Sequence, residues 1–136
     1  MKTVVLGVIT KEDKVLIGKK KPGPHPAGLG GKWHVIGGVK EAGESEIDAL
    51  KREVMEEAHL KVKVLRKLGE KIVTTSGKKA KVITFLCEAQ GWKAVADSDL
   101  VNVKWIPKQN FLDEICEESK RLLPLKSVQE ALSQMF

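Results

Sequence analysis

Strand-like runs of apolar residues stand before and after a central helical segment. Residues 3–9 and 15–18 are rich in β-branched and apolar side chains, and the polar stretch KEDK between them predicts a hairpin of two strands. A turn signal at residues 76–79 predicts a second antiparallel pair. The further strand-like runs are residues 61–68, 71–75, 80–89 and 100–106.

The central segment repeats apolar residues with a helical period. The repeat predicts a stripe along one side of a helix, which would pack on the sheet. The stripe consists of Ile47, Leu50, Val54 and Ala58. Ser45 is the expected N-cap, and Asp48 stands at the position that completes a weak capping box.

Towards the C-terminus the pattern becomes helical again. Residues 109–120 and 126–135 predict two helices, and Pro124 separates them because proline interrupts a helix. Strands on both sides of helices indicate an α/β fold. The 136 residues are long enough for one core, so we expect a single domain over residues 1–136.

Proline and glycine are dense at residues 21–31, KPGPHPAGLGG, which excludes regular structure there. We expect a long loop beside the functional site, since such loops usually carry function. For His25 within the loop we favour a solvated side chain over a ligand. Residues 91–99 are a second expected loop.

A second side of the central helix carries three carboxylates close together. Glu53, Glu56 and Glu57 stand at i, i+3 and i+4, where like charges repel each other in a helix. Only Arg52 offers a positive charge nearby. Oxygen ligands without a balancing protein cation suit a hard divalent ion, Mg²⁺ or Mn²⁺.

The segment from Gly38 to Leu60 resembles the Nudix box, G-x5-E-x7-R-E-U-x-E-E-x-G-U, where U is a bulky aliphatic residue. Eight of the fixed positions match. They are Gly38, Glu44, Arg52, Glu53, Val54, Glu56, Glu57 and Leu60. The one departure is His59, which replaces a glycine expected to cap the helix in the left-handed conformation. Histidine tolerates that conformation better than most residues, so we expect some loss of stability and unchanged chemistry.

The resemblance implies the Nudix fold, an α-β-α sandwich around a mixed sheet, and a hydrolase that needs Mg²⁺, with Mn²⁺ as the alternative. Glu53 and Glu57 would be the principal metal ligands, with Glu56 joining them or bridging through water. The Gly38 carbonyl would complete the set. The resemblance also implies that Arg52 orients the glutamates and that Glu44 supports Arg52.

The general base stays open among Glu53, Glu56 and Asp99. In MutT-like members an acidic residue six positions before a tryptophan completes the site, and Asp99 has that spacing from Trp105. Asp97 and, more distantly, Glu88 are the alternatives.

Three residues are candidates for substrate binding. Family members commonly carry a basic residue near the phosphates where Lys19 and Lys20 stand, although both could simply be surface lysines. Trp33 precedes the glycine pair as in the family's W-x-x-P-G-G strand, with Ile36 in place of the proline. It could line a base pocket or pack in the core, and we slightly favour the core.

The resemblance favours a (deoxy)nucleoside triphosphate pyrophosphohydrolase of MutT type, an enzyme of nucleotide-pool housecleaning. ADP-ribose or nucleotide-sugar hydrolysis is the alternative, and a non-catalytic Nudix module that binds a nucleotide or RNA is the alternative of another class. Thr75 or Ser76 stands where ADP-ribose hydrolases carry a proline, and the absence of tyrosine speaks against dinucleoside polyphosphates. Leu122 occupies the place of the base-binding asparagine of MutT proper.

Charge is unevenly distributed. Residues 41–57 hold seven acids against two basic residues, a local charge of −5, which leaves +11 for the rest of a chain whose net charge is +6. A basic surround could attract an anionic substrate or could simply be a solvated surface. Nucleic acid is an unexpected partner, because no recognition motif appears and three Trp, three Phe and no Tyr offer little for stacking.

No apolar run is long enough to span a membrane, and the N-terminus becomes charged too soon for a signal peptide. We therefore expect a cytoplasmic protein that does not bind membranes. A homodimer is expected by analogy with the family alone.

Overall fold

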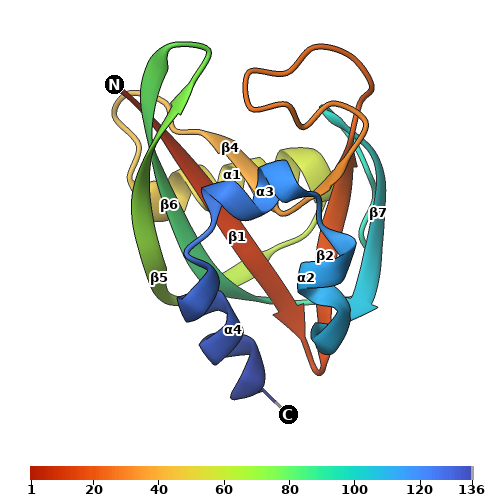
Figure 1. The fold of residues 1–136 in the computed structure, drawn as a ribbon. Coiled ribbons are helices and arrows are strands. Elements are labelled where there is room, and N and C mark those ends of the chain that lie inside the picture. The colour runs from red at the N-terminus through yellow and green to blue at the C-terminus, as the bar shows by residue number, and fades with distance from the viewer. Residues whose placement is uncertain (136) are drawn as a thin grey trace.

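The computed structural model describes residues 1–135, which form one mixed sheet with helices on both faces (Figure 1). Strand β1 is central: it pairs antiparallel with β2 and β4 along one edge and parallel with β6 along the other. The hairpin expected near the N-terminus is formed by β1 and β2. The strands are β1 (Lys2–Lys11), β2 (Lys14–Lys20), β3 (Trp33–His34), β4 (Ile36–Val39), β5 (Val62–Thr75), β6 (Lys78–Ala89) and β7 (Leu100–Pro107).

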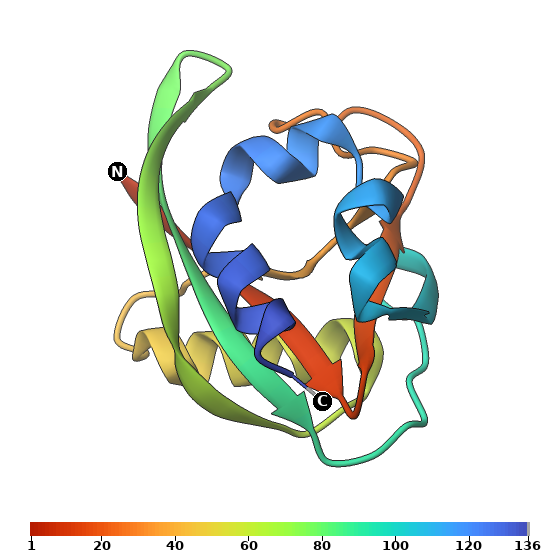
Figure 2. The ribbon, with the colours of Figure 1, turned by 60° about the horizontal axis from the view of Figure 1, so that its bottom comes forward.

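Side chains of β1 point alternately to the two faces of the sheet, and each face has its own hydrophobic core. Val5 and Ile9 face one cluster, under α1 (Glu46–Ala58), whereas Leu6 and Val8 face the other, under the C-terminal helices. Figures 1 and 2 show α1 and the C-terminal helices on opposite sides of β1. The expected α-β-α sandwich around a mixed sheet is confirmed. The C-terminal helices are α2 (Phe111–Glu114), α3 (Glu117–Leu122) and α4 (Leu125–Ser133), preceded by a 3₁₀ turn at Lys108–Asn110.

Helix α1 has the expected caps. The Ser45 hydroxyl accepts a hydrogen bond from the Asp48 amide at 3.1 Å. His59 ends the helix in the left-handed conformation, with φ of 55°, and its amide donates to the Met55 carbonyl. The histidine therefore takes the backbone conformation for which the family uses glycine.

The apolar stripe of α1 differs from the expected one. Leu50, Val54 and Ala58 are fully buried, but Ile47 is 42% exposed and Ala49 is buried instead. At about 100° per residue, this rotates the buried face towards Glu57, which lies angularly between Ala49 and Leu50. The packing of α1 therefore buries one of the three carboxylates.

Two other expectations were wrong in detail. Residues 61–68 and 71–75 form one long strand, β5, whose register shifts absorb the break in alternation. The helix expected at residues 109–120 is interrupted at Ile115, which is extended, and the next amide, of Cys116, donates to the Trp33 carbonyl at 3.1 Å. A long-range hydrogen bond thus replaces a local helical one. No helix among residues 1–135 is long and apolar enough to cross a membrane.

Candidate functional site

Where β4 leads into α1, a carboxylate of the helix lies against the backbone of the strand. A Cβ atom on Gly38 would lie 2.5 Å from the carboxyl carbon of Glu53, so a side chain at this position would collide with that group. Strand β4 holds Gly38 in register with Val5 of β1. The glycine therefore allows the Glu53 carboxylate to lie directly over the peptide chain.

Glu57 is the most buried of the clustered carboxylates, with a 2% exposed side chain. One of its oxygens accepts from the Gly37 amide at 3.3 Å, and the other lies 3.4 Å from Lys20 Nζ. Burial raises the pKa of Glu57 to about 7, against the opposing effect of the Lys20 charge. One lysine and one amide leave this carboxylate incompletely compensated.

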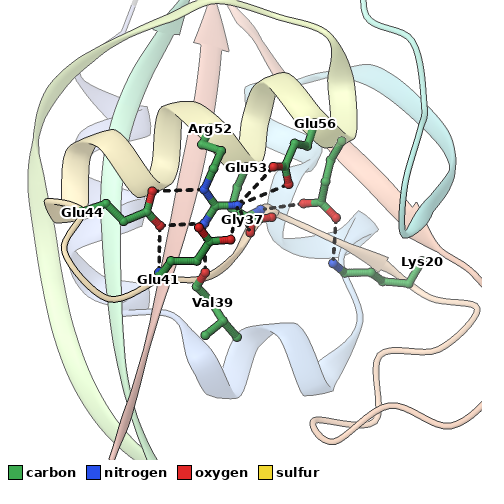
Figure 3. A network of polar contacts seen from close by, with 9 residues as sticks. Lys20, Gly37, Val39, Glu41, Glu44, Arg52, Glu53 and Glu56 are labelled. Atoms are coloured by element: carbon green, nitrogen blue, oxygen red, sulfur yellow. Dashed lines mark hydrogen bonds and ion pairs between the residues drawn. The ribbon is translucent and has the colours of Figure 1, made fainter.

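Arg52 is the hub of the exposed half of the cluster (Figure 3). Its Nε and Nη2 donate to both oxygens of Glu44, at 3.1 and 2.7 Å. Its Nη1 donates to Glu53 at 3.0 Å and to Glu56 at 3.2 Å, and Nη2 also reaches the Val39 carbonyl. The contacts that the sequence predicted between Arg52 and the glutamates are present.

These contacts and burial give the carboxylates of the cluster different pKa values. Hydrogen bonds from Arg52 lower the pKa of Glu44 to about 2, and the glutamates in turn raise the pKa of Arg52. Burial raises the pKa of Glu53 despite its contact with Arg52. Negative charge is thus stable at Glu44 and disfavoured at Glu53 and Glu57.

The donor set fits a divalent cation. Among residues 1–135, no three His, Cys, Asp or Glu side chains converge tightly enough to enclose an ion as they stand. Arg52 holds Glu53 and Glu56, so either carboxylate must turn from Arg52 to close such a site. The donors are all oxygens, the Gly38 cradle admits one of them, and Glu53 and Glu57 are both raised in pKa by burial. A hard cation at this place would supply the missing positive charge.

Of the two candidate lysines, the fold brings Lys20 to the cluster. The Lys19 side chain makes no hydrogen bond or ion pair among the described residues, and the register of β2 on β7 shifts between Lys19 and Lys20. Lys20 is 7% exposed, and a buried lysine requires a partner. Its ammonium group is the closest cation to the buried half of the cluster.

The carboxylates of the acidic candidates in the 91–99 loop make no hydrogen bond to Glu53, Glu56 or Glu57. The Asp99 carbonyl accepts from the Lys21 amide at 2.9 Å, and its exposed carboxylate makes no hydrogen bond among the described residues. Asp97 is tied to α1: its amide donates to the Glu57 carbonyl, and its carboxylate lies 2.8 Å from His59 Nε2. Glu88 is exposed on β6. The fold brings none of these carboxylates into contact with Glu53 or Glu57.

The sequence analysis considered a base pocket and the core as places for Trp33. In the structure Trp33 packs in the core, and its neighbour His34 lines a cavity. Trp33 packs against the cluster under the C-terminal helices, with Lys104 Nζ 4.3 Å from its ring centroid. His34, one residue on, is 2% exposed and lines a cavity. Sequence reasoning missed His34, although strand alternation from Trp33 could have indicated it.

The cavity has a volume of about 180 Å³ and adjoins the carboxylate cluster. Its wall shares Lys20, Gly37 and Gly38 with the site described above. Side chains of β1, β5 and β6 make it largely apolar. Its polar side chains are Lys2, Lys20, His25, His34 and Thr75. His25, expected to be solvated, is partly buried in this wall.

Comparison with known proteins shows the family to which this fold belongs. The family model described as NUDIX domain matches residues 1–126. The chain belongs to the NUDIX family. A related protein, the oxidized purine nucleoside triphosphate hydrolase of Danio rerio, is 30% identical over 106 residues. The match covers 76% of this chain but only 65% of that relative's length.

Solved structures have the same NUDIX fold. The MutT protein of Methanosarcina mazei Go1 superposes with a TM-score of 0.78 at 18% identity, covering 98% of this chain and 93% of that one. A bifunctional NMN adenylyltransferase/ADP ribose pyrophosphatase of Francisella tularensis, complexed with AMP and a manganese ion, superposes with a TM-score of 0.69 at 21% identity. That match covers 96% of this chain and 42% of the other. The relatives of this NUDIX domain are thus named as hydrolases and pyrophosphatases.

Proposed function

We propose that this NUDIX domain hydrolyses a diphosphate linkage of nucleoside triphosphates with the help of a divalent cation, and releases a nucleoside monophosphate and pyrophosphate. The observation that carries the proposal is the pair of carboxylates of the partly buried Glu53 and the buried Glu57, beside a cavity with which they share Lys20 and the glycine pair. A substrate could thus place its base in the cavity and its phosphates at the carboxylates.

Glu53, Glu57 and Glu56, with the Gly38 carbonyl, would hold the cation, which is Mg²⁺ in our proposal and Mn²⁺ as the alternative. When bound, the cation neutralises phosphoryl charge and lowers the pKa of water. Lys20 supplies a second positive charge to the phosphate chain. Arg52 fixes the glutamates through its hydrogen bonds, and Glu44 holds Arg52 by two of them.

Glu56 is the group to which we assign the proton of the attacking water. The water oxygen bonds to phosphorus while the bond to the bridging oxygen breaks, and pyrophosphate leaves. Half of the Glu56 side chain is exposed, so it can pass the proton to solvent. Glu53 is 15% exposed and Glu57 is 2% exposed, and the Asp99 carboxylate makes no hydrogen bond to a described residue.

Purine nucleotides, including oxidised ones, are the first substrates to test, because the Danio rerio relative is named for them. A role in nucleotide-pool housecleaning would follow. ADP-ribose and a nucleotide sugar represent the alternative substrate class. The cytoplasmic location and the homodimer stay predictions.

The test is phosphate and pyrophosphate release from these nucleotides with Mg²⁺ or Mn²⁺, with Glu53→Gln beside the parent protein. We expect metal-dependent release of pyrophosphate, reduced by orders of magnitude in Glu53→Gln. Glu46→Gln is the matched control, since it changes the same residue type in the first turn of the same helix, away from the cluster. Tight nucleotide binding without turnover would favour the non-catalytic module instead.

A further inference from the structure

The cavity beside the carboxylates has an unusual set of polar groups. Its apolar wall includes Leu6, Val82 and Leu122, from both the sheet and α3. Four of its five polar side chains end in nitrogen: Lys2, Lys20, His25 and His34. Whether these nitrogens donate or accept decides which ligand the cavity can hold, and the hydrogen bonds around the two histidines determine it.

The tautomer of His34 follows from its contact with Ser119. His34 Nδ1 lies 2.5 Å from the hydroxyl oxygen of Ser119, which is fully buried on α3. Among the described residues the Ser119 hydroxyl has no other hydrogen-bond partner, and donation to Nδ1 is the arrangement that satisfies its buried proton, so we infer it here. Nδ1 is then the acceptor and the ring proton is on Nε2.

His34 is also neutral. Burial lowers its pKa well below the ordinary value, and the charge of Lys20 lowers it further. The Nε2–H group makes no hydrogen bond within residues 1–135, and the ring lines the cavity. It is therefore a donor available to whatever the cavity holds.

His25 repeats the arrangement on the loop between β2 and β3. Its Nδ1 accepts from the Ala27 amide at 3.0 Å, which leaves the proton of the neutral ring on Nε2. Partial burial and Lys20 lower the pKa of His25. With the ammonium groups of Lys2 and Lys20, every nitrogen-bearing side chain of the cavity is a donor. The Thr75 hydroxyl is the one side-chain acceptor among the described lining residues.

The structure assigns to His34 the role of reading the nucleobase: its Nε2–H donates to a carbonyl oxygen of the base, and the cavity selects bases that present a carbonyl group, such as a 6-oxopurine, over adenine, which presents an amino group at that position. This inference rests on the proposed function, which places the base in the cavity. An amino group facing the donors would leave both partners unsatisfied. We expect a preference on the order of ten- to a hundredfold.

Inosine and adenosine nucleotides test the inference, because they differ only at position 6 and at N1 of the base. Inosine has a 6-oxo group and a protonated N1, and adenosine has a 6-amino group and an unprotonated N1. Hydrolysis of ITP and ATP is compared as kcat/KM. Binding of the monophosphates IMP and AMP is measured by calorimetry without metal, which separates base recognition from the reaction. The parent protein should prefer the inosine form in both measurements.

Variants locate the preference at His34. In His34→Gln the amide can donate or accept by rotating, so the ratio between inosine and adenosine nucleotides should fall to within about threefold while IMP still binds. Ser119→Ala removes the group that determines the tautomer and should reduce the ratio partly. Thr75→Val is the matched control, since it removes the one side-chain acceptor of the same cavity without removing a donor nitrogen, and should not lower the preference.

The outcomes separate the two proposals. Equal hydrolysis of ITP and ATP by the parent protein, or an unchanged ratio in His34→Gln, would overturn the assignment of His34 while the proposed reaction stands. Selective binding of IMP that His34→Gln abolishes, without hydrolysis of any nucleotide, would support His34 and overturn the reaction. Failure of both monophosphates to bind would overturn the placement of the base.

Discussion

Glu44 and Glu57 lie at opposite ends of the carboxylate cluster, and their surroundings differ. Glu44 is held by two hydrogen bonds from Arg52, which lower its pKa to about 2. Glu57 is enclosed between α1 and β4, and burial raises its pKa to about 7. The same side chain is therefore permanently ionised at one end and close to half protonated at neutral pH at the other. Solvent access and the nearest cation, rather than residue type, determine the charge.

The comparison suggests different tasks for the two halves of the cluster, the exposed half around Arg52 and the buried half around Glu57. The exposed half is held together by hydrogen bonds from Arg52, so it can keep its geometry without a ligand. The buried half has Lys20 at 3.4 Å and the Gly37 amide at 3.3 Å, which do not offset the loss of water. A bound cation would act mainly on the buried half.

The largest expected effect is at the buried end. Glu57→Gln should reduce hydrolysis by more than the roughly 10–100-fold that loss of an outer partner costs, because it removes a proposed ligand. Without metal, the same variant should melt at a higher temperature than the parent at pH 8, because a neutral amide replaces a buried charge. Calorimetric melting with and without Mg²⁺ measures both states. A lower melting temperature for metal-free Glu57→Gln would contradict this view of the buried half.

The pH dependence follows from Glu57. Its folded-state pKa, about 7, is above its ordinary value near 4.5, so its contribution to metal-free stability is present at low pH and is lost as pH rises through 7. Metal binding requires the ionised form of Glu57, so the affinity for metal should increase as pH rises. We expect affinity for Mn²⁺ to be about tenfold weaker at pH 6 than at pH 8. Titration calorimetry at both pH values checks this, and Glu57→Gln should show a flatter profile.

The exposed end should respond less. Glu44→Gln removes the charge that fixes Arg52 and should lower kcat by about 10–100-fold, as is typical when a group that orients ligands is lost. Metal-free stability at neutral pH should fall as well, because the variant loses the charge-assisted hydrogen bonds that lower the pKa of Glu44. Steady-state kinetics with Glu46→Gln as the control measure the effect. A loss as large as that of Glu57→Gln would remove the distinction between the halves.

The smallest effect is expected at His59, beyond the end of the cluster. His59→Gly restores the residue that the family uses for the left-handed cap, but it removes the hydrogen bond that lowers the pKa of Asp97. Since that pKa is depressed, the bond stabilises the fold above the ordinary pKa of the acid and its contribution is lost as pH falls. We expect activity within about threefold of the parent and a small change in melting temperature.

A double-mutant cycle isolates the His59 contact. Asp97→Asn should lower the melting temperature in the parent at pH 7 and have no effect in His59→Gly. Equal effects in both backgrounds would show that the Asp97 carboxylate acts through the hydrogen bond it accepts from the Ser98 amide instead.

Much of the candidate site was accessible from local sequence patterns. The spacing of Glu53, Glu56 and Glu57 on one helix, the Ser45 cap and the left-handed His59 depend on neighbours within a few residues, and the structure contains them as expected. The placement of the apolar stripe was less secure. Ile47 stands at the edge of the buried face, so periodicity alone could not distinguish it from Ala49.

Long-range contacts decided the rest. The choice of Lys20 over Lys19 depends on the ion pair between Lys20 of β2 and Glu57 of α1, and the pair of His34 with Ser119 joins residues 85 positions apart. The bond from Cys116 to Trp33 breaks the expected C-terminal helix just before Ser119. No local pattern carries this information.

The sequence by itself thus determined the family, the central helix and the chemical identity of its carboxylates, because these follow from residue type and helical spacing. The tertiary structure decided which carboxylate is buried, which lysine meets it and which histidine faces the cavity. The physical reason is that burial and hydrogen bonding depend on surfaces brought together from distant parts of the chain, and those surfaces set the charge and donor pattern of the site.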